Sequence, residues 1–276
     1  MSINLTGRTA LVTGVSAGLG EGVARVFAAM GAHVVGIARR AERGEVLAAE
    51  IRAAGGHLDF IAGDITNPAC RERAVAACLS ATGRLDILIN NAGVGGILAP
   101  VQDYPDTAWD QTIAVNLSAA FGLCRLALPT MRAQRDGVIL NIASINAHFG
   151  ITKMAAYCAA KAGLVHLTKV LAAEGVDANV RANAIILGGV ESEMNRATTI
   201  AMAQSATGSG AVPSDERLAH YRSLMMKPAD VAAALAALCL PEAALITGSE
   251  IAIDQAMTAG AAASALIHGG AAALLA

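Results

Sequence analysis

Two side chains suited to proton transfer lie four residues apart in a helical pattern. Tyr157 and Lys161 fall at positions i and i+4 of the helix predicted over residues 155–174, so they share one face. A free phenol has a pKa of about 10 and is a poor acid or base at neutral pH, but a nearby ammonium favours the phenolate and lowers that pKa. The pair is therefore expected to protonate a carbonyl oxygen, or to deprotonate an alcohol in the reverse direction.

A serine hydroxyl follows the strand predicted over residues 137–143. Ser144 stands at the carboxyl end of this strand, which is where parallel α/β sheets bind their ligands. A hydroxyl there is placed to hydrogen-bond the same substrate oxygen as Tyr157 and to polarise it. Each residue also has a purely structural interpretation, Lys161 as a solvated helix charge and Ser144 as a strand-end hydroxyl.

A glycine-rich loop near the start of the chain predicts a phosphate-binding site. Residues 13–20 read TGxxxGxG and lie between an apolar strand-like run at 8–13 and a helical pattern at 19–30. Glycines at such a turn let the backbone approach a phosphate, and the free N–H groups of the first helical turn face the anion. A dinucleotide pyrophosphate is the expected ligand. The predicted contacts are Gly14, Ser16, Ala17, Gly18, Leu19 and Gly20.

The same loop satisfies a rival motif. Residues 14–18 also read G-x-S-x-G, the nucleophile elbow of serine hydrolases, with Ser16 as the nucleophile. Only a few residues precede the strand at 8–13, which leaves no room for the earlier strands and the upstream oxyanion loop of that fold. A serine hydrolase is therefore the weaker interpretation.

Short apolar runs alternate with longer helical patterns along the chain, as repeated βα units require. The predicted strands span residues 8–13, 33–38, 58–62, 85–90, 137–143, 179–186 and 250–254. The predicted helices span residues 19–30, 42–54, 68–82, 107–133, 155–174 and 229–239. Because the strands are apolar nearly throughout, we expect one α/β domain over residues 1–276 with a parallel sheet covered on both faces.

Two segments interrupt this alternation. Residues 191–228 contain a stretch at 204–210 that is predicted to be flexible inside an otherwise helical region, and the segment is either a lid over the substrate or a surface loop. The tail at 259–276 is rich in Ala, Gly and Leu, and it either packs at a subunit interface or frays.

Composition excludes several classes of protein. The chain has 20 basic and 22 acidic residues and a formal net charge of −2, which gives no electrostatic basis for binding nucleic acid or an anionic membrane. No uninterrupted apolar run predicts a membrane span, and no long apolar core at the start predicts a signal peptide. The five scattered cysteines indicate buried, reduced thiols in a cytoplasmic protein, and the six histidines form no metal-ligand pattern.

Several motifs occur together in a characteristic order. They are the TGxxxGxG loop, Asn90-Asn91-Ala92-Gly93, Asn116, Ser144 and Tyr157-x-x-x-Lys161. In this order and approximate spacing, the chain resembles the short-chain dehydrogenase/reductase (SDR) family from about residue 6 to about residue 256. The resemblance implies a catalytic tetrad of Asn116, Ser144, Tyr157 and Lys161. In that scheme Lys161 also binds the nicotinamide ribose, and Asn116 holds a water that links Lys161 to solvent.

The resemblance also implies the fold and the cofactor cleft. We expect a Rossmann-like, doubly wound, seven-stranded sheet in the order 3-2-1-4-5-6-7 with helices on both faces, in a dimer or homotetramer. Asp64 would lie beside the adenine, although Asp64 followed by Thr66 is also typical of a turn. The other implied cofactor contacts are Ile65, Asn91, Ala92, Gly93, Tyr157, Lys161, Gly188, Val190 and Ser192.

The end of the second strand predicts which nicotinamide cofactor is used. An NAD site normally has an acid there, about twenty residues past the first glycines, to hold the ribose hydroxyls. Ala38 occupies that position, and Arg39 and Arg40 follow it with guanidinium groups that suit a 2′-phosphate. The same departure marks NADP-preferring members of the resembled family. NADP(H) is therefore favoured and NAD(H) is the alternative, while an Arg-Arg pair can also be a solvated turn.

Two loops depart from the family pattern. Leu187 replaces a proline after the sixth strand, which is expected to loosen the loop beside the nicotinamide. Gln255 and Ala256 stand where the family commonly has two glycines, so that loop is expected to differ in shape. The implied substrate cleft is mostly apolar and contains no arginine; its lining would be Gly95, Gly96, Ile97, Ser144, Asn146, His148, Gly189, Val190 and Met194. A hydrogen-bonded structural role is the alternative for His148.

These features predict an NADP(H)-dependent enzyme that interconverts a neutral, fairly hydrophobic ketone and a secondary alcohol. The alternatives within the same fold are an NAD-dependent alcohol dehydrogenase, an enoyl reductase or an epimerase. A protein that only senses the nucleotide is a further alternative, which the complete tetrad disfavours.

Overall fold

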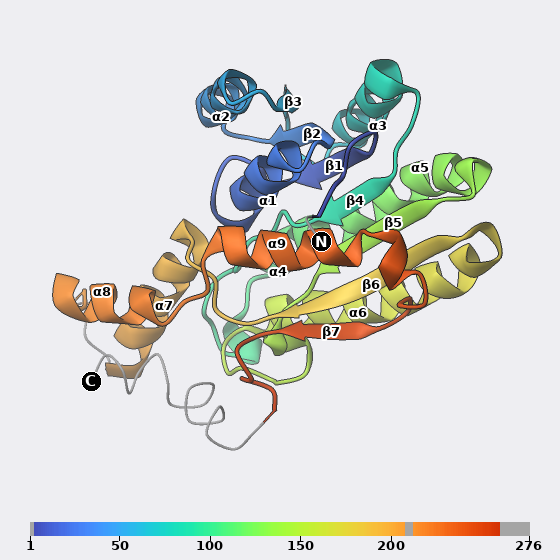
Figure 1. The fold of residues 1–276 in the computed structure, drawn as a ribbon. Helices are drawn as coiled ribbons and strands as arrows, with labels where there is room; N and C mark the ends of the chain where they lie inside the picture. Colours follow the sequence, from blue (N-terminus) through green and yellow to red (C-terminus); the bar gives the residue numbers. More distant parts are fainter. Residues whose placement is uncertain (1–2, 208–211, 260–276) are drawn as a thin grey trace.

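The predicted strands form one parallel sheet of seven strands, in the order β3-β2-β1-β4-β5-β6-β7. The structure, a computed structural model, describes residues 3–207 and 212–259 (Figure 1). The strands are β1 (Thr9–Thr13), β2 (His33–Ala38), β3 (His57–Ala62), β4 (Ile87–Asn90), β5 (Gly137–Ile142), β6 (Val180–Leu187) and β7 (Glu250–Ile253). The predicted fold class and strand order are thereby confirmed.

The strand order reverses between β1 and β4, and this reversal positions the functional site. β1 lies between β2 and β4, and its Leu11 is in register with Val35 of β2 on one side and with Leu88 of β4 on the other. The chain winds outward from β1 through β2 to β3, and then outward in the other direction from β4 to β7. Doubly wound sheets leave a crevice at the carboxyl ends of the strands at such a switch point.

Helices cover both faces of the sheet. They are α1 (Gly18–Ala29), α2 (Ala41–Ala53), α3 (Pro68–Thr82), α4 (Asp106–Ile113), α5 (Ala119–Gln134), α6 (Ala155–Gly175), α7 (Glu193–Thr207), α8 (Asp215–Ser223) and α9 (Pro228–Leu238). One apolar cluster joins α1, α2 and α9 to one face, and a second joins α3, α5 and α6 to the other (Figure 1). The strands are therefore buried on both sides, which explains their nearly continuous apolar sequences.

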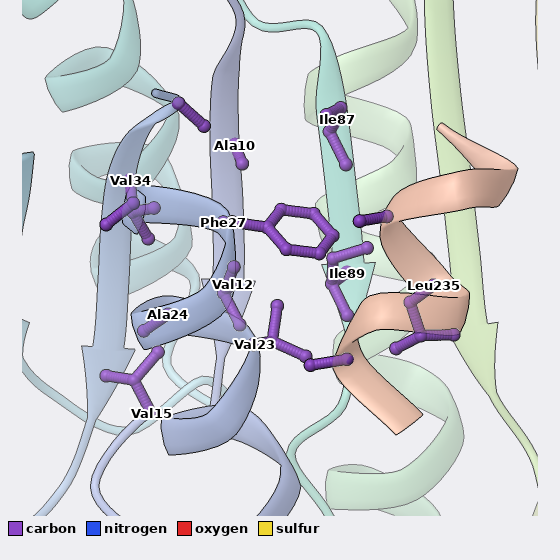
Figure 2. Packing of buried hydrophobic residues seen from close by; sticks show 14 of the residues in the cluster. Ala10, Val12, Val15, Val23, Ala24, Phe27, Val34, Ile87, Ile89 and Leu235 are labelled. Atoms are coloured by element: carbon purple, nitrogen blue, oxygen red, sulfur yellow. The ribbon is translucent and has the colours of Figure 1, made fainter. Parts of the chain in front are cut away.

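Phe27 of α1 lies at the centre of the first apolar cluster. Its ring lies close to Val12 of β1 and to Ile87 and Ile89 of β4, and Leu235 of α9 belongs to the same cluster (Figure 2). The side chain of Phe27 is fully buried. Burying a side chain of this size stabilises a fold by roughly 1.5–3 kcal/mol. This packing fixes α1, and with it the glycine-rich loop that precedes the helix, against the two central strands.

The long helix predicted over residues 107–133 is interrupted in the structure. α4 ends at Ile113, one π-helical turn follows at Ala114–Ser118, and α5 begins at Ala119. Asn116 lies in that π turn. A π turn adds one residue to the hydrogen-bonded ring and often marks a functional position, but it changes neither composition nor apolar spacing enough to be seen in a sequence.

The stretch Asp106–Gln134 is long and apolar enough to cross a membrane if only its length and composition are considered. In the fold, 44% of its most apolar window is buried. α4 packs against α6, and α5 packs against α3 and β5. These contacts account for the apolar composition without a membrane.

The segment predicted as a lid or loop, residues 191–228, contains two helices. Figure 1 shows α7 and α8 beside each other past one end of the sheet. The stretch predicted to be flexible begins inside a helix, because α7 extends to Thr207; residues 208–211 lie outside the described residues. The tail prediction concerns residues 259–276, of which only Ala259 is described.

The cysteines are all free. Four are buried, as predicted, and Cys158 is partly exposed. Burial raises the pKa of Cys78, Cys124 and Cys239 to about 12, so these thiols remain protonated. A thiol that stays protonated is a poor nucleophile, which is consistent with packing roles for these three residues.

Candidate active site

A cavity of about 490 Å³ lies at the carboxyl ends of the strands, beside the switch point. Ligand pockets typically have volumes of about 300–1,000 Å³. The predicted contact residues that line it are Gly14, Ser16, Ala17, Gly18, Leu19, Arg39, Arg40, Asp64, Ile65, Asn91, Ala92, Gly93, Gly95, Ser144, Asn146, Tyr157, Lys161, Gly188, Gly189, Val190, Ser192 and Met194. The predicted residues outside the lining are Gly20, Gly96, Ile97, Asn116 and His148.

The glycine-rich loop has the backbone of an anion-binding turn. Gly14 and Gly18 adopt φ values of +78° and +56°, in the left-handed region that favours glycine. Ala17, the residue at the N-cap of α1, has no side chain that could accept a hydrogen bond from the first turn. The N–H groups of that turn are therefore available where Gly18 and Leu19 line the cavity, and they fit a pyrophosphate.

Gly20 contributes to packing and not to the cavity wall. A Cβ atom at this position would lie 2.3 Å from the carbonyl oxygen of Gly14 and 2.6 Å from Nδ2 of Asn91. The absence of a side chain therefore lets α1 approach the loop and the end of β4. The structural role that the geometry shows for Gly20 is this close packing.

We predict that Gly20→Ala destabilises the protein by about 1–3 kcal/mol, because the methyl group forces backbone atoms apart in a packed region. Chemical denaturation measures the change. Gly150→Ala is the control, since a Cβ atom at Gly150 has open space around it and should change stability by less than about 0.5 kcal/mol. Equal stabilities of the two variants would contradict the packing role.

Ser16 does not have the surroundings of a nucleophile. Its hydroxyl accepts a hydrogen bond from Nε of Arg40 at 3.1 Å, and its carbonyl oxygen accepts one from the same guanidinium at 3.3 Å. Arginine is permanently protonated and cannot act as a base. Within the described part of the chain, no histidine or carboxylate is hydrogen-bonded to the Ser16 hydroxyl. The geometry therefore gives no support to the serine hydrolase interpretation.

Arg39 and Asp64 both line the cavity, and the charge of Arg39 acts on the Asp64 carboxyl. Arg39 is exposed and makes no hydrogen bond within residues 3–207 and 212–259. Burial alone would raise the pKa of Asp64, but hydrogen bonds from Thr66 and the charge of Arg39 outweigh it and hold this pKa below its usual value. Asp64 Oδ1 accepts from the backbone N and the Oγ1 of Thr66, both at 2.8 Å, so its turn role and its place in the cavity wall coexist.

Tyr157 and Ser144 meet in the cavity wall. The Tyr157 hydroxyl is hydrogen-bonded to the Ser144 side chain, and Ser144 Oγ also accepts from the backbone N of Asn146 at 3.2 Å. Burial raises the pKa of Tyr157 to about 12, and the hydrogen bond with Ser144 offsets this only in part. The expected lowering of this pKa by Lys161 was therefore wrong for the cofactor-free protein: desolvation of the phenolate outweighs the favourable interactions.

Lys161 is buried beneath Tyr157. Its Nζ donates to the carbonyl oxygen of Ile142 at 2.7 Å and lies 5.6 Å from the centroid of the Tyr157 ring. Burial lowers the pKa of Lys161 to about 8. The ammonium is thus held close to Tyr157 with only one hydrogen-bond partner within the described residues, although an ammonium has three donors.

Asn116 holds the loop that follows β4. Its Nδ2 donates to the carbonyl oxygens of Val94 at 3.0 Å and Thr112 at 2.9 Å, and its Oδ1 accepts from the backbone N of Val94 at 3.2 Å. A Cβ atom on Gly93 would lie 2.7 Å from Asn116 Oδ1 and 3.8 Å from Lys161 Nζ. The Asn116 side chain is therefore close to Lys161, but its hydrogen bonds within the described residues are to backbone groups.

Ile97 and His148 do not reach the cavity. His148 Nε2 forms an ion pair with Glu250 Oε2 at 3.0 Å when the ring is protonated, and Lys169 contacts the other oxygen of the same carboxylate at 2.7 Å. The structural alternative for His148 is the one that the geometry favours. Ile97 is 41% exposed and also lies away from the lining.

One face of α7 supplies lining residues, and of these sequence reasoning had considered only the methionines, as lid or core residues. Asn195, Thr198, Thr199 and Met202 have the spacing i, i+3, i+4, i+7, and all four line the cavity. This spacing is the signal that could have found them. Tyr221 of α8 joins them, and its Oη donates to Asn195 Oδ1 at 3.2 Å. These residues add amide and hydroxyl groups to a lining that is mostly apolar.

Comparison with known proteins identifies the family. The family model described as short chain dehydrogenase matches residues 8–203. The chain belongs to the short-chain dehydrogenase/reductase family. It is therefore an oxidoreductase that acts on CH–OH and C=O groups of a small molecule, with NAD(P)(H) as its cofactor.

Individual relatives agree with this assignment. D-threitol dehydrogenase of Mycolicibacterium smegmatis is 35% identical over 257 residues, which are 92% of this chain and 94% of that enzyme. D-beta-hydroxybutyrate dehydrogenase of Cupriavidus necator is 40% identical over 67% of this chain and 72% of that enzyme. The crystal structure of levodione reductase superimposes with a TM-score of 0.85 at 26% identity, covering 94% of this chain and 100% of the other.

The two departures from the SDR pattern have different structural outcomes. Gln255 and Ala256 adopt φ values of +53° and +64°, the conformations that glycine favours, and each costs roughly 1–2 kcal/mol for an L residue. The side chain of Asp254 holds this turn by accepting from the backbone N of Ala256 at 3.0 Å and of Thr258 at 2.8 Å. Leu187 lines the cavity where SDR enzymes usually have proline.

Proposed function

We propose that this SDR enzyme interconverts a neutral, fairly hydrophobic ketone and a secondary alcohol with NADP(H), using Tyr157 as the acid or base. The observation that carries the proposal is the placement of Tyr157, Ser144 and Lys161 in one wall of a cavity that the uncapped N-terminus of α1 also lines. Proton transfer and phosphate binding are thereby available to one bound cofactor–substrate pair.

In the reducing direction the proposed reaction adds a hydride and a proton to the carbonyl group. The nicotinamide, when bound, supplies the hydride to the carbonyl carbon. Tyr157 donates its phenolic proton to the oxygen, which leaves a phenolate, and Ser144 donates a hydrogen bond that orients the oxygen. Lys161, 5.6 Å from the ring centroid, stabilises the phenolate by its charge until a proton from solvent restores the phenol. Alcohol oxidation is the reverse sequence.

The NADP(H) preference rests on the end of β2. Ala38 offers no carboxylate to a ribose 2′-hydroxyl, and the exposed Arg39 has no hydrogen-bond partner in the described part of the protein. A 2′-phosphate would give this guanidinium a charged acceptor. NADPH is kept reduced in most cells, so the proposal favours carbonyl reduction as the working direction.

We predict that Arg39→Ala weakens NADPH binding about tenfold and leaves NADH binding within about twofold, because a charge-assisted hydrogen bond to the 2′-phosphate is lost. Fluorescence titration with both cofactors measures the effect. Arg52 is an exposed arginine of α2, so Arg52→Ala is the control for the change in overall charge. Preference of the wild type for NADH would overturn the role of Arg39 and indicate an NAD-dependent alcohol dehydrogenase.

The substrate proposal follows from the uncharged face of α7. Apart from Glu193, the residues of α7 that line the cavity carry amide, hydroxyl or thioether groups and no charge. These groups suit a neutral substrate and can hydrogen-bond a second oxygen on it. Lining residues with this property are Met194, Asn195, Thr198, Thr199 and Met202.

We also propose a homo-oligomer, a dimer or tetramer, in the cytoplasm. Exposed apolar side chains occur on the outer helices and before β7, among them Phe121 at 50% and Leu245 at 97% exposure. Burial of such side chains against a second copy would stabilise an assembly. The free thiols suit a reducing compartment.

A further inference from the structure

Glu193, the first residue of α7, forms ion pairs with two arginines at the N-terminus of α2. Glu193 Oε2 contacts the guanidinium of Arg40 at 2.6 Å, and its Oε1 contacts that of Arg43 at 2.6 Å. Glu193 and Arg40 both line the cavity, next to Arg39. The hydrogen bonds from Arg43 and Arg40 hold the pKa of Glu193 below its usual value, so the carboxylate is ionised at neutral pH.

The position of Glu193 is set by its backbone neighbours. A Cβ atom on Gly18 would lie 3.0 Å from Cβ of Ser192, so the start of α7 packs directly on the glycine-rich loop. The segment before it pairs with Met226, whose N donates to Gly189 O and whose O accepts from Glu191 N, both at 3.0 Å. Glu193 therefore reaches Arg40 from an anchored segment and not from a free surface loop.

Glu193 occupies the one guanidinium nitrogen of Arg40 that is not already bonded to Ser16, and an anionic ligand would need this nitrogen. Two nitrogens of Arg40, Nε and one terminal nitrogen, already donate to Ser16. The other terminal nitrogen donates to Glu193. An anion that approaches Arg40 from the cavity must therefore share or displace the carboxylate, and like charges repel at this distance.

We propose that Glu193 tunes the cofactor preference of this enzyme by competing with the adenosine 2′-phosphate for Arg40. The inference rests on the proposed function only in taking this cavity as the cofactor site. A ribose with a free 2′-hydroxyl leaves the Glu193 ion pairs in place, whereas a 2′-phosphate meets the carboxylate at Arg40. Arg39, which has no hydrogen bond in the described structure, is then the guanidinium that receives the phosphate first.

Two adenosine fragments isolate this effect from the rest of the cofactor. Titration calorimetry with adenosine 2′,5′-bisphosphate and adenosine 5′-monophosphate gives a dissociation-constant ratio that depends on the 2′-phosphate alone. In Glu193→Gln the ratio should shift about threefold to tenfold towards the bisphosphate, and less at high salt, because an exposed carboxylate is removed from beside the phosphate. Glu191→Gln is the matched control: Glu191 faces Arg222 at 3.5 Å and lies outside this cavity, so its ratio should not change.

The outcomes separate this inference from the cofactor proposal. An unchanged ratio in Glu193→Gln would overturn the inference. If both affinities changed equally, Glu193 would only hold α7 against α2, and if neither affinity changed, it would have no part in cofactor recognition. A wild type that prefers the monophosphate, with a Glu193→Gln variant shifted towards the bisphosphate, would overturn the NADP(H) preference and support the inference. Failure of both fragments to bind would contradict both.

Discussion

Tyr157→Phe is expected to lower the rate of carbonyl reduction by about 10²–10⁴-fold, the usual contribution of a positioned acid or base. The variant keeps the ring, which stands in the cavity wall over Lys161, and loses only the hydroxyl that meets Ser144. Cofactor affinity should therefore stay within about threefold of the wild type. Steady-state rates with a neutral ketone, together with a fluorescence titration of the cofactor, measure the two quantities separately.

Tyr221→Phe is the matched control for this prediction. Tyr221 also lines the cavity, and its hydroxyl donates only to Asn195 among the described residues. Its loss should change the apparent affinity for substrate more than turnover. If Tyr221→Phe abolished turnover and Tyr157→Phe did not, the assignment of the proton-transfer residue would be wrong.

The pKa of Tyr157 predicts how the two directions respond to pH. Because this pKa is raised to about 12, the hydroxyl is protonated throughout the neutral range in the cofactor-free protein. Reduction, which needs the phenol, should change little with pH there. Oxidation, which needs the phenolate, should become faster as pH rises.

Lys161→Met is expected to change how stability depends on pH. Burial lowers the pKa of Lys161 from 10.5 to about 8, so the folded state disfavours the ammonium. Above pH 10.5 the side chain is neutral in both states and the penalty is absent. As pH falls towards 8 the unfolded chain binds a proton first, and wild-type stability falls by about 1.4 kcal/mol per pH unit from this group. Below about pH 8 the penalty is constant.

The wild type should therefore gain about 2–3 kcal/mol relative to Lys161→Met between pH 8 and pH 10. Chemical denaturation of the cofactor-free proteins across this range measures the gain. Lys169→Met, an exposed lysine of the same helix that pairs with Glu250, should show no such trend. A pH-independent difference between wild type and Lys161→Met would contradict the buried ammonium.

The fold was largely predictable because apolar runs and their spacing determine it. The strands at 33–38 and 137–143 agree with β2 and β5 to within one residue. The start of β4 at Ile87 was placed at residue 85, since the buried Leu85 continues the apolar run towards the strand. Asp86 already bonds to both neighbouring strands, because its N donates to Thr9 O at 3.0 Å and its O accepts from Val138 N at 2.8 Å. The π turn around Asn116 was not predictable, because it alters hydrogen bonding and not composition.

Among the site residues, those set by local motifs were predictable, and those whose partners are distant in sequence were not. Gly14, Gly18, Ser144 and Tyr157 were found because each stands at a fixed offset from a strand end or on a known motif, where backbone geometry determines the direction of the side chain. The choice between the two interpretations of His148 could not be made from the sequence, because its partner, Glu250, is distant in sequence. The same reason applies to Glu193 and Asn195, whose partners lie on other elements. The direction of the Tyr157 pKa shift could not be predicted from the sequence either, because it depends on how deeply the hydroxyl is buried in the folded protein.

Isotope transfer tests the central claim most directly. The wild type is incubated with NADPH carrying deuterium at the transferred position of the nicotinamide and with a panel of neutral ketones, and the alcohol products are analysed by mass spectrometry. We expect one deuterium on the carbinol carbon of at least one product, and label transfer by Tyr157→Phe that is slower by about 10²–10⁴-fold under the same conditions. Cofactor binding without label transfer to any ketone, or undiminished transfer by Tyr157→Phe, would contradict a carbonyl reductase that uses Tyr157.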